Sequence, residues 1–160
     1  MKLTFKGDHL LCEIGDFERK LEASCIVRNE INGWRKLHKP SDVVKAMCED
    51  PYHKPPVMPR VFPKGCWEVF TPLKRRNPYL APYFIPTSAE QYLDVWSLDP
   101  EGGYDKATGE KVLDLGYGLH YSSSNTTVGC IRLHYENDLL WLVNILSEEF
   151  EHSHRTWILV

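Results

Sequence analysis

Apolar and polar residues alternate along the first part of the chain, and a period of two is the pattern of β-strands that bury one face. Lys2–Phe5, His9–Glu13 and Leu21–Val27 follow this pattern, and Gly-Asp pairs separate the runs. Ser41–Glu49 instead predicts a short helix, with Ser41 as its N-cap. We therefore expect short strands, then a helix, before the middle of the chain.

Proline-rich segments cover Pro51–Pro63 and Pro72–Pro86 and exclude regular helix there. Between them, Lys64–Phe70 has the pattern of a strand. The second segment carries the basic triplet Lys74-Arg75-Arg76 and the aromatic residue Tyr83. A basic triplet is usually a solvated loop, and the alternative is contact with an anionic polymer.

The next part of the chain predicts a projecting hairpin. Tyr92–Leu98 is typical of a strand, and turn residues follow at 99–103 and at Thr108-Gly109. Lys111–His120 has the pattern of a further strand, which delivers a histidine at its end. The hairpin would therefore stand directly before this histidine.

A helical period of apolar residues appears after Asn137-Asp138 and continues to about Glu151. This predicted apolar stripe consists of Leu139, Leu142, Val143, Leu146 and Phe150. Thr156–Val160 then predicts a buried closing strand. The whole pattern indicates a mostly β, single-domain fold, a β-sandwich of mixed strands with a helix packed on it.

Composition and charge exclude several classes of protein. The chain has 160 residues, 42% of them hydrophobic and 26% charged, which suits one globular domain. A net charge of −3 gives no reason to expect a nucleic acid partner. No apolar run is long enough for a membrane span. The first residues lack the apolar stretch of a secretory signal, so we expect export by another route or a trimmed chain.

The cysteine count is five, which leaves at least one thiol unpaired. Cys12, Cys25 and Cys66 lie in strand-like apolar contexts, and we expect them to be small buried hydrophobic residues. The absence of any Cys-x-x-Cys pair argues against a zinc ribbon.

Residues 120–134 contain the candidate chemistry. Cys130 follows Gly129 directly, and Arg132 and an upstream His120 lie nearby in the sequence. A cysteine attacks as its thiolate, so it needs a group that takes its proton or favours its charge. His120 would be that base, and Arg132 would favour the thiolate, bind a substrate carboxylate or brace the loop. The alternatives without catalysis are that Cys130 is a buried structural thiol and that His120 is a hydrogen-bonded core histidine.

The segment Thr127-Val-Gly-Cys-Ile-Arg-Leu133 resembles the catalytic motif of the L,D-transpeptidases with a YkuD-type fold: Ser or Thr, any residue, Gly, Cys, a branched residue and often Arg. His120 matches the histidine on the preceding strand of that family. The helix from Asn137 and the strand Trp157–Val160 are similar to the family's next helix and last strand. Met58–Val69 resembles the family's Thr-Pro-x-Gly-x-Tyr/Phe-x-Ile segment, so the resemblance covers roughly 57–160.

The resemblance implies one domain over 1–160, with amino-terminal strands and a short helix in 1–56 and a catalytic core in 57–160. It implies acyl transfer on peptidoglycan stem peptides through a thioester on Cys130, as a transpeptidase, carboxypeptidase or exchange enzyme, with no cofactor and no metal. The residues that would carry the reaction are Cys130, His120, Gly129 and Arg132. The residues that would line the substrate site are Tyr83, Tyr121, Thr127, Val128 and His134.

Some positions depart from the family pattern. The family usually has His-Gly where this chain has His120-Tyr121, and often has histidine where this chain has Val128. The separation between His120 and Cys130 is also shorter than in most members. A shorter loop would open the site to water or would misplace the histidine.

The opening strands are also similar to those of interbacterial effectors that carry an L,D-transpeptidase-like domain. That relation implies action in the periplasm or cell envelope, and an immunity protein as partner if the chain is an effector. The alternative functions are a non-catalytic or phage-associated wall-binding module, or another thiol amidase on the same scaffold. For the enzyme, we expect iodoacetamide to label Cys130 first, and His120→Ala to slow that labelling.

Overall fold

The computed structural model describes residues 1–27, 57–75, 82–98 and 104–160. The predicted helix at Ser41–Glu49 lies outside these residues. The described strands belong to one continuous sheet and one hairpin. The strands of the sheet, in chain order, are β1 (Lys2–Phe5), β2 (His9–Ile14), β3 (Phe17–Ser24), β4 (Cys66–Val69), β5 (Leu73–Lys74), β6 (Tyr83–Pro86), β9 (Gly118–Tyr121), β10 (Ile131–Leu133) and β11 (Thr156–Leu159).

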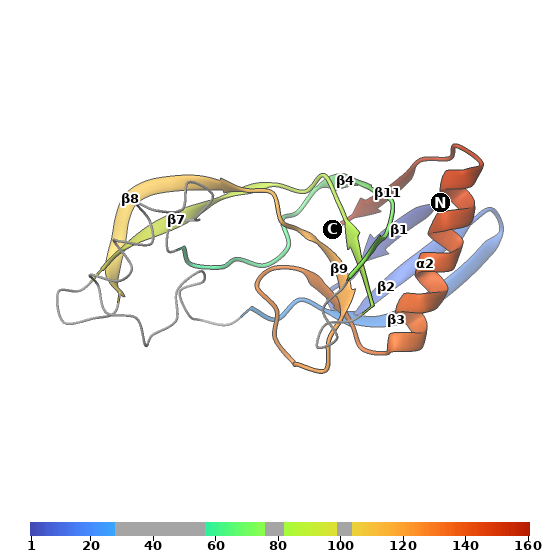
Figure 1. The fold of residues 1–160 in the computed structure, drawn as a ribbon, viewed down its shortest axis with the longest axis horizontal. Coiled ribbons are helices and arrows are strands. Elements are labelled where there is room, and N and C mark those ends of the chain that lie inside the picture. The colour runs from blue at the N-terminus through green and yellow to red at the C-terminus, as the bar shows by residue number, and fades with distance from the viewer. Residues whose placement is uncertain (28–56, 76–81, 99–103) are drawn as a thin grey trace.

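The sheet has nine strands in the order β4-β11-β1-β2-β3-β10-β9-β6-β5 and curls beside the helix α2 (Glu136–Glu151) (Figure 1). Most neighbours are antiparallel, but β1 pairs with β11 and β10 with β9 in parallel. Because β3 pairs with β10, the amino-terminal strands are integral to the sheet that holds the nucleophile segment. The prediction of a mostly β, single-domain chain is therefore confirmed, and the finer YkuD-type fold stays a proposal.

The predicted hairpin is present as β7 (Gln91–Leu98) and β8 (Tyr104–Asp114), and it extends away from the sheet and helix (Figure 1). The predicted turn at Thr108-Gly109 is wrong, because both residues lie inside β8. The pairing shifts there, from Asp94 opposite Lys111 to Trp96 opposite Ala107. Gly109 has a φ of +84°, so the glycine serves a bulge within the strand rather than a turn.

The single strand predicted for Lys111–His120 is two strands. β8 ends at Asp114 and β9 begins at Gly118. The intervening Tyr117 is only 2% exposed, and its hydroxyl accepts a hydrogen bond from Gln91 Nε2 at 2.7 Å. Tyr117 therefore anchors the connection between the hairpin strand β8 and the sheet strand β9.

The helix α2 follows the predicted stripe closely. Leu139, Leu142, Val143 and Leu146 are buried, and Phe150 packs at the edge of the core. They meet apolar residues of the sheet, among them Leu10, Leu119, Ile131 and Ile158. No helix in the described part of the chain is long and apolar enough to cross a membrane.

The predicted buried closing strand is present as β11, but it is buried on one face only. Thr156 and Ile158 face the core, whereas Trp157 and Leu159 are 40% and 44% exposed. Cys66, predicted to be buried, is also exposed. It lies on the edge strand β4 opposite Leu159, and side chains that pair across strands share a face, so Cys66 points outward.

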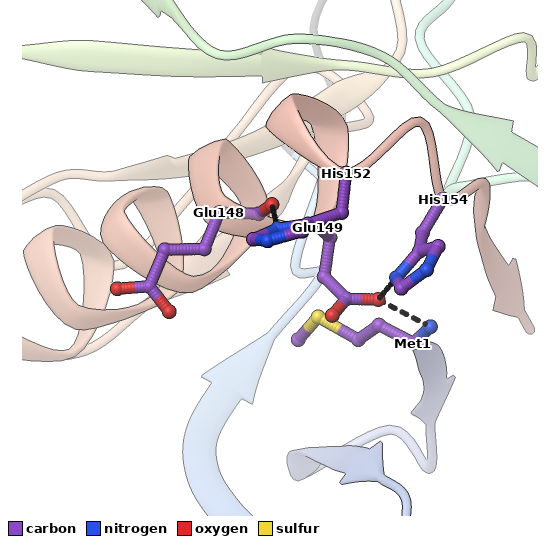
Figure 2. A network of polar contacts seen from close by, with 5 residues as sticks. All are labelled: Met1, Glu148, Glu149, His152 and His154. Carbon is purple, nitrogen blue, oxygen red and sulfur yellow. Dashed lines mark hydrogen bonds and ion pairs between the residues drawn. The ribbon is translucent and has the colours of Figure 1, made fainter.

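An ion-pair network joins the first strand to the end of α2 (Figure 2). The Met1 ammonium group lies 3.0 Å from Glu149 Oε2, and His154 Nδ1 lies 3.5 Å from the same oxygen. The hydrogen bond and charge of the Met1 ammonium group lower the pKa of Glu149. Beside it, the Glu148 carbonyl oxygen accepts from His152 Nδ1 at 2.8 Å and from the His152 backbone N–H at 3.2 Å, so His152 caps the helix end.

Candidate active site

Two neighbouring parallel strands, β9 and β10, position the predicted base and nucleophile. Ile131 pairs with Leu119, and Arg132 pairs with His120. Because side chains alternate along a strand, Ile131 and Leu119 enter the core while Arg132 and His120 share the opposite face. Cys130 precedes Ile131 and therefore lies on the face of His120, beside Gly118.

The loop before Cys130 is fixed by a hydroxyl and a glycine. Thr127 Oγ1 donates to the Cys130 carbonyl oxygen at 2.8 Å and accepts from the Gly129 N–H at 3.2 Å. Gly129 has a φ of +122°, where side chains are rare. A Cβ at this position would lie 2.7 Å from Tyr117 Cε1 and 2.8 Å from the Arg60 carbonyl oxygen. Thr127 therefore caps the turn, and only glycine fits beside it.

A second thiol, Cys25, follows β3 directly and contacts the same loop. Its Sγ donates to the Gly129 carbonyl oxygen at 3.3 Å and accepts from the Phe62 N–H at 3.3 Å. Burial raises the pKa of Cys25, which keeps the thiol protonated and able to donate. The sequence predicts only a small buried residue here, since nothing in the spacing links Cys25 to Gly129.

The Cys130 thiol is protonated at neutral pH. It is 8% exposed, and its Sγ donates to the Gly116 carbonyl oxygen at 3.6 Å. Burial raises the pKa of Cys130 to about 11, although a hydrogen bond from the Gly118 N–H favours the thiolate. The neighbours of the sulfur thus include polar backbone groups, but the resting sulfur is not ionised at neutral pH.

His120 is held in the state of a base. Its Nδ1 donates to the Tyr121 carbonyl oxygen at 3.1 Å, since a carbonyl only accepts, and this leaves the lone pair on Nε2. Burial lowers the pKa of His120, and the charges of Arg75 and Arg132 lower it further. The ring is therefore neutral at pH 7. Among the described residues no hydrogen bond joins it to Cys130.

Arg132 braces the loop, one of its predicted roles. Its Nε donates to the Ser122 carbonyl oxygen at 2.7 Å. Ser122 begins the segment that runs from β9 to Cys130, so this contact ties the two ends of the segment together. The guanidinium is also close enough to affect the pKa of His120.

The predicted substrate residues divide between the two faces. Val128 is 50% exposed at the tip of the loop, whereas Thr127 is buried. Tyr83 and Tyr121 pack against the hydrophobic core, on the face opposite His120. His134 lies across β10 at the β3 side, with Nε2 2.9 Å from Ser24 Oγ. Because Ser24 pairs with Arg132, His134 lies on the face of Arg132 and His120, whereas Tyr83 and Tyr121 lie on the opposite face.

Phe84 and Arg75 complete this face, and the sequence did not predict their part in it. Phe84 pairs with His120, and a Cβ at Gly118 would lie 2.5 Å from Phe84 Cζ, so the ring covers Gly118. The Arg75 guanidinium carbon lies 4.8 Å from the centre of the Phe84 ring. In the sequence, Arg75 stands out only as a member of the basic triplet Lys74-Arg75-Arg76.

Comparisons of the chain with protein-family models, curated proteins and solved structures give no match. The resemblance to L,D-transpeptidases therefore depends on the motif residues alone. Within the described ranges, no group of three or more His, Cys, Asp or Glu side chains is arranged to hold a metal ion.

The accessibility of the thiols changes the expected labelling order. We now expect iodoacetamide to modify the exposed Cys66 before Cys130, because a pKa of about 11 leaves Cys130 roughly one part in ten thousand thiolate at pH 7. Labelling of Cys130 should rise about tenfold per pH unit until the pH reaches that pKa. Peptide mass spectrometry at several pH values measures both rates. Faster labelling of Cys130 than of Cys66 at neutral pH would mean that His120 ionises the thiol in solution.

Proposed function

We propose that this chain is a cysteine-dependent acyl-transfer enzyme that acts on peptidoglycan stem peptides, as a transpeptidase, carboxypeptidase or exchange enzyme. One observation carries the proposal: the adjacent parallel strands β9 and β10 bring His120 and Cys130 to one face of the sheet. The imidazole there is neutral, and its Nε2 lone pair is available. The motif Thr127–Leu133 supplies the substrate class by resemblance. The proposed substrate implies action in the periplasm or cell envelope.

The first chemical step is attack of Cys130 Sγ on the carbonyl between the third and fourth stem residues. Substrate binding must first turn Sγ from the Gly116 carbonyl toward His120, because the resting thiol donates elsewhere. Catalytic hydrogen bonds are often absent before substrate binds. His120 Nε2 then takes the proton, and it returns this proton to the departing amine as the thioester forms.

The second step releases the thioester. An amine acceptor gives a cross-link or an exchanged peptide, and water gives a shortened stem. The Gly129 N–H already bonds to Thr127 Oγ1 and is not free to hold the developing oxyanion. The Gly118 N–H, which already favours the thiolate, lies at the reacting sulfur and is a better candidate for charge stabilisation.

A second candidate function is a non-catalytic wall-binding module. The buried, protonated state of Cys130 favours it, since a thiol with a pKa of about 11 is a poor nucleophile at rest. This candidate keeps the same fold and the same ligand class, and it differs only in the absence of a thioester.

Incubation of the protein with a stem tetrapeptide ending in D-alanine separates these functions. The enzyme should release free D-alanine, exchange it for an added D-amino acid, and gain the mass of the acyl group on Cys130. Binding without any product would leave only the wall-binding module. Cleavage at a different amide bond would identify another thiol amidase on this scaffold. Mass spectrometry of both peptide and protein reads each outcome.

A further inference from the structure

Arg75 is held at the face of the sheet that carries the nucleophile. Its backbone N–H donates to the Pro82 carbonyl oxygen at 2.8 Å, and its guanidinium carbon lies 4.8 Å from the Phe84 ring centre. Phe84 in turn pairs with His120 and covers Gly118. Stacking on an aromatic ring orients a guanidinium while leaving its N–H donors free for a planar anion.

The charge of Arg75 is not neutralised within the described part of the chain. No carboxylate there forms an ion pair with Arg75, whereas Arg19 and Arg155 pair with Asp138 and Glu68. The charge of Arg75 reaches both reacting groups, because it lowers the pKa of His120 and favours the thiolate of Cys130. A partly buried, oriented cation without an acid is an expected receptor for an anionic ligand.

We propose that Arg75 is a specificity-determining residue that binds a carboxylate of the acyl donor beside the bond under attack. The donor class is then a peptide with a free carboxylate close to the scissile carbonyl, rather than an amidated or esterified peptide. Arg132 is less suited to this role, because its Nε already donates to the Ser122 carbonyl oxygen. This inference rests on the proposed acyl transfer for its substrate, but the anion site itself can be tested without any turnover.

The first test compares two alkylating reagents that differ only in charge. At mildly alkaline pH, anionic iodoacetate and neutral iodoacetamide react with Cys130, and the exposed Cys66 in the same sample gives the intrinsic ratio of the two rates. We expect iodoacetate to be favoured at Cys130 relative to Cys66. Arg75→Met should lower that preference about threefold to tenfold, and added salt should weaken it. Lys74→Met is the matched control, since it removes an exposed positive charge from the residue directly before Arg75.

Arg75→Lys separates charge from geometry: it should keep part of the iodoacetate preference. Circular dichroism checks that each variant is folded. An Arg75→Met protein that is folded and keeps the full preference, or a wild type with no preference at all, would overturn the anion site.

The second test uses stem tetrapeptides with a free or an amidated terminal carboxylate. Arg75→Met should lower kcat/KM for the free acid about tenfold more than for the amide, because any lost stabilisation of the Cys130 thiolate affects both peptides equally. Turnover of both peptides with no preference in the wild type would overturn this inference and leave the acyl-transfer proposal standing. A wild type inactive on both peptides, with an iodoacetate preference that depends on Arg75, would overturn acyl transfer and support the anion site.

Discussion

Replacing Cys130 with alanine should abolish release of D-alanine from a stem tetrapeptide, with a loss of at least about a thousandfold in rate. The reason is that the proposed reaction passes through a thioester on this sulfur, and no other described cysteine lies on the face of His120 in the sheet. Cys25 donates to the Gly129 carbonyl, Cys12 is buried in the core, and Cys66 points outward from β4. Mass spectrometry of the released amino acid and of the protein measures both turnover and the acyl adduct.

Cys66→Ala is the matched control, because it removes an exposed thiol on the far edge of the sheet. It should keep full activity and the same acyl adduct. Activity that survives Cys130→Ala, or that disappears in Cys66→Ala, would rule out Cys130 as the nucleophile. Loss of the adduct together with loss of D-alanine release, in a variant that remains folded, would support the proposed mechanism.

The regular elements were the most predictable part of this chain. Alternation predicted β1, β2 and β4, and the period of Leu139, Leu142 and Leu146 predicted α2, because these patterns report which side must face a core. Where a strand bends, the pattern is less informative. Gly109 sits within β8 at a change of register, and a glycine in a bulge has the same local sequence signal as a glycine in a turn.

The candidate site was predictable as a segment but not as a geometry. The sequence pointed to His120 and Cys130, but the register of β9 and β10 decides that they share a face. The hydrogen-bond partners of the thiol, Gly116 and Gly118, also lie outside its own loop. Arg75 and Cys25 reach the site from distant segments, so no local spacing could reveal them; Cys25 and Gly129 are 104 positions apart.

Burial favours the neutral form of both reacting groups. Burial disfavours charge, so it raises the pKa of Cys130 and lowers that of His120. The resting pair is therefore a neutral thiol and a neutral imidazole. Proton transfer between them creates two charges, and the Gly118 N–H and the nearby cations must offset that cost. Gly118 and Arg75, which lie outside the motif, therefore also bear on the proposed reaction.

The second large effect is expected for Gly129→Ala, which should destabilise the protein by roughly 2–5 kcal/mol. Two costs add. The backbone at φ +122° strains any residue with a Cβ, and the new methyl group would lie 2.7 Å from Tyr117 Cε1 and 2.8 Å from the Arg60 carbonyl oxygen. Urea denaturation measures the change in the free energy of unfolding. In a separate thermal unfolding experiment, we expect the midpoint temperature to fall by roughly 5–15 °C.

Gly7→Ala is the control that separates these two costs. Gly7 also has a positive φ, +98°, but nothing lies within 4 Å of the position its Cβ would take. It should therefore show the backbone cost alone, about 1–2 kcal/mol. The difference between the two variants measures how tightly Tyr117 and Arg60 pack against the nucleophile loop. Equal destabilisation would mean that the loop has room to move, and a loop with that freedom would not hold Cys130 in place for attack.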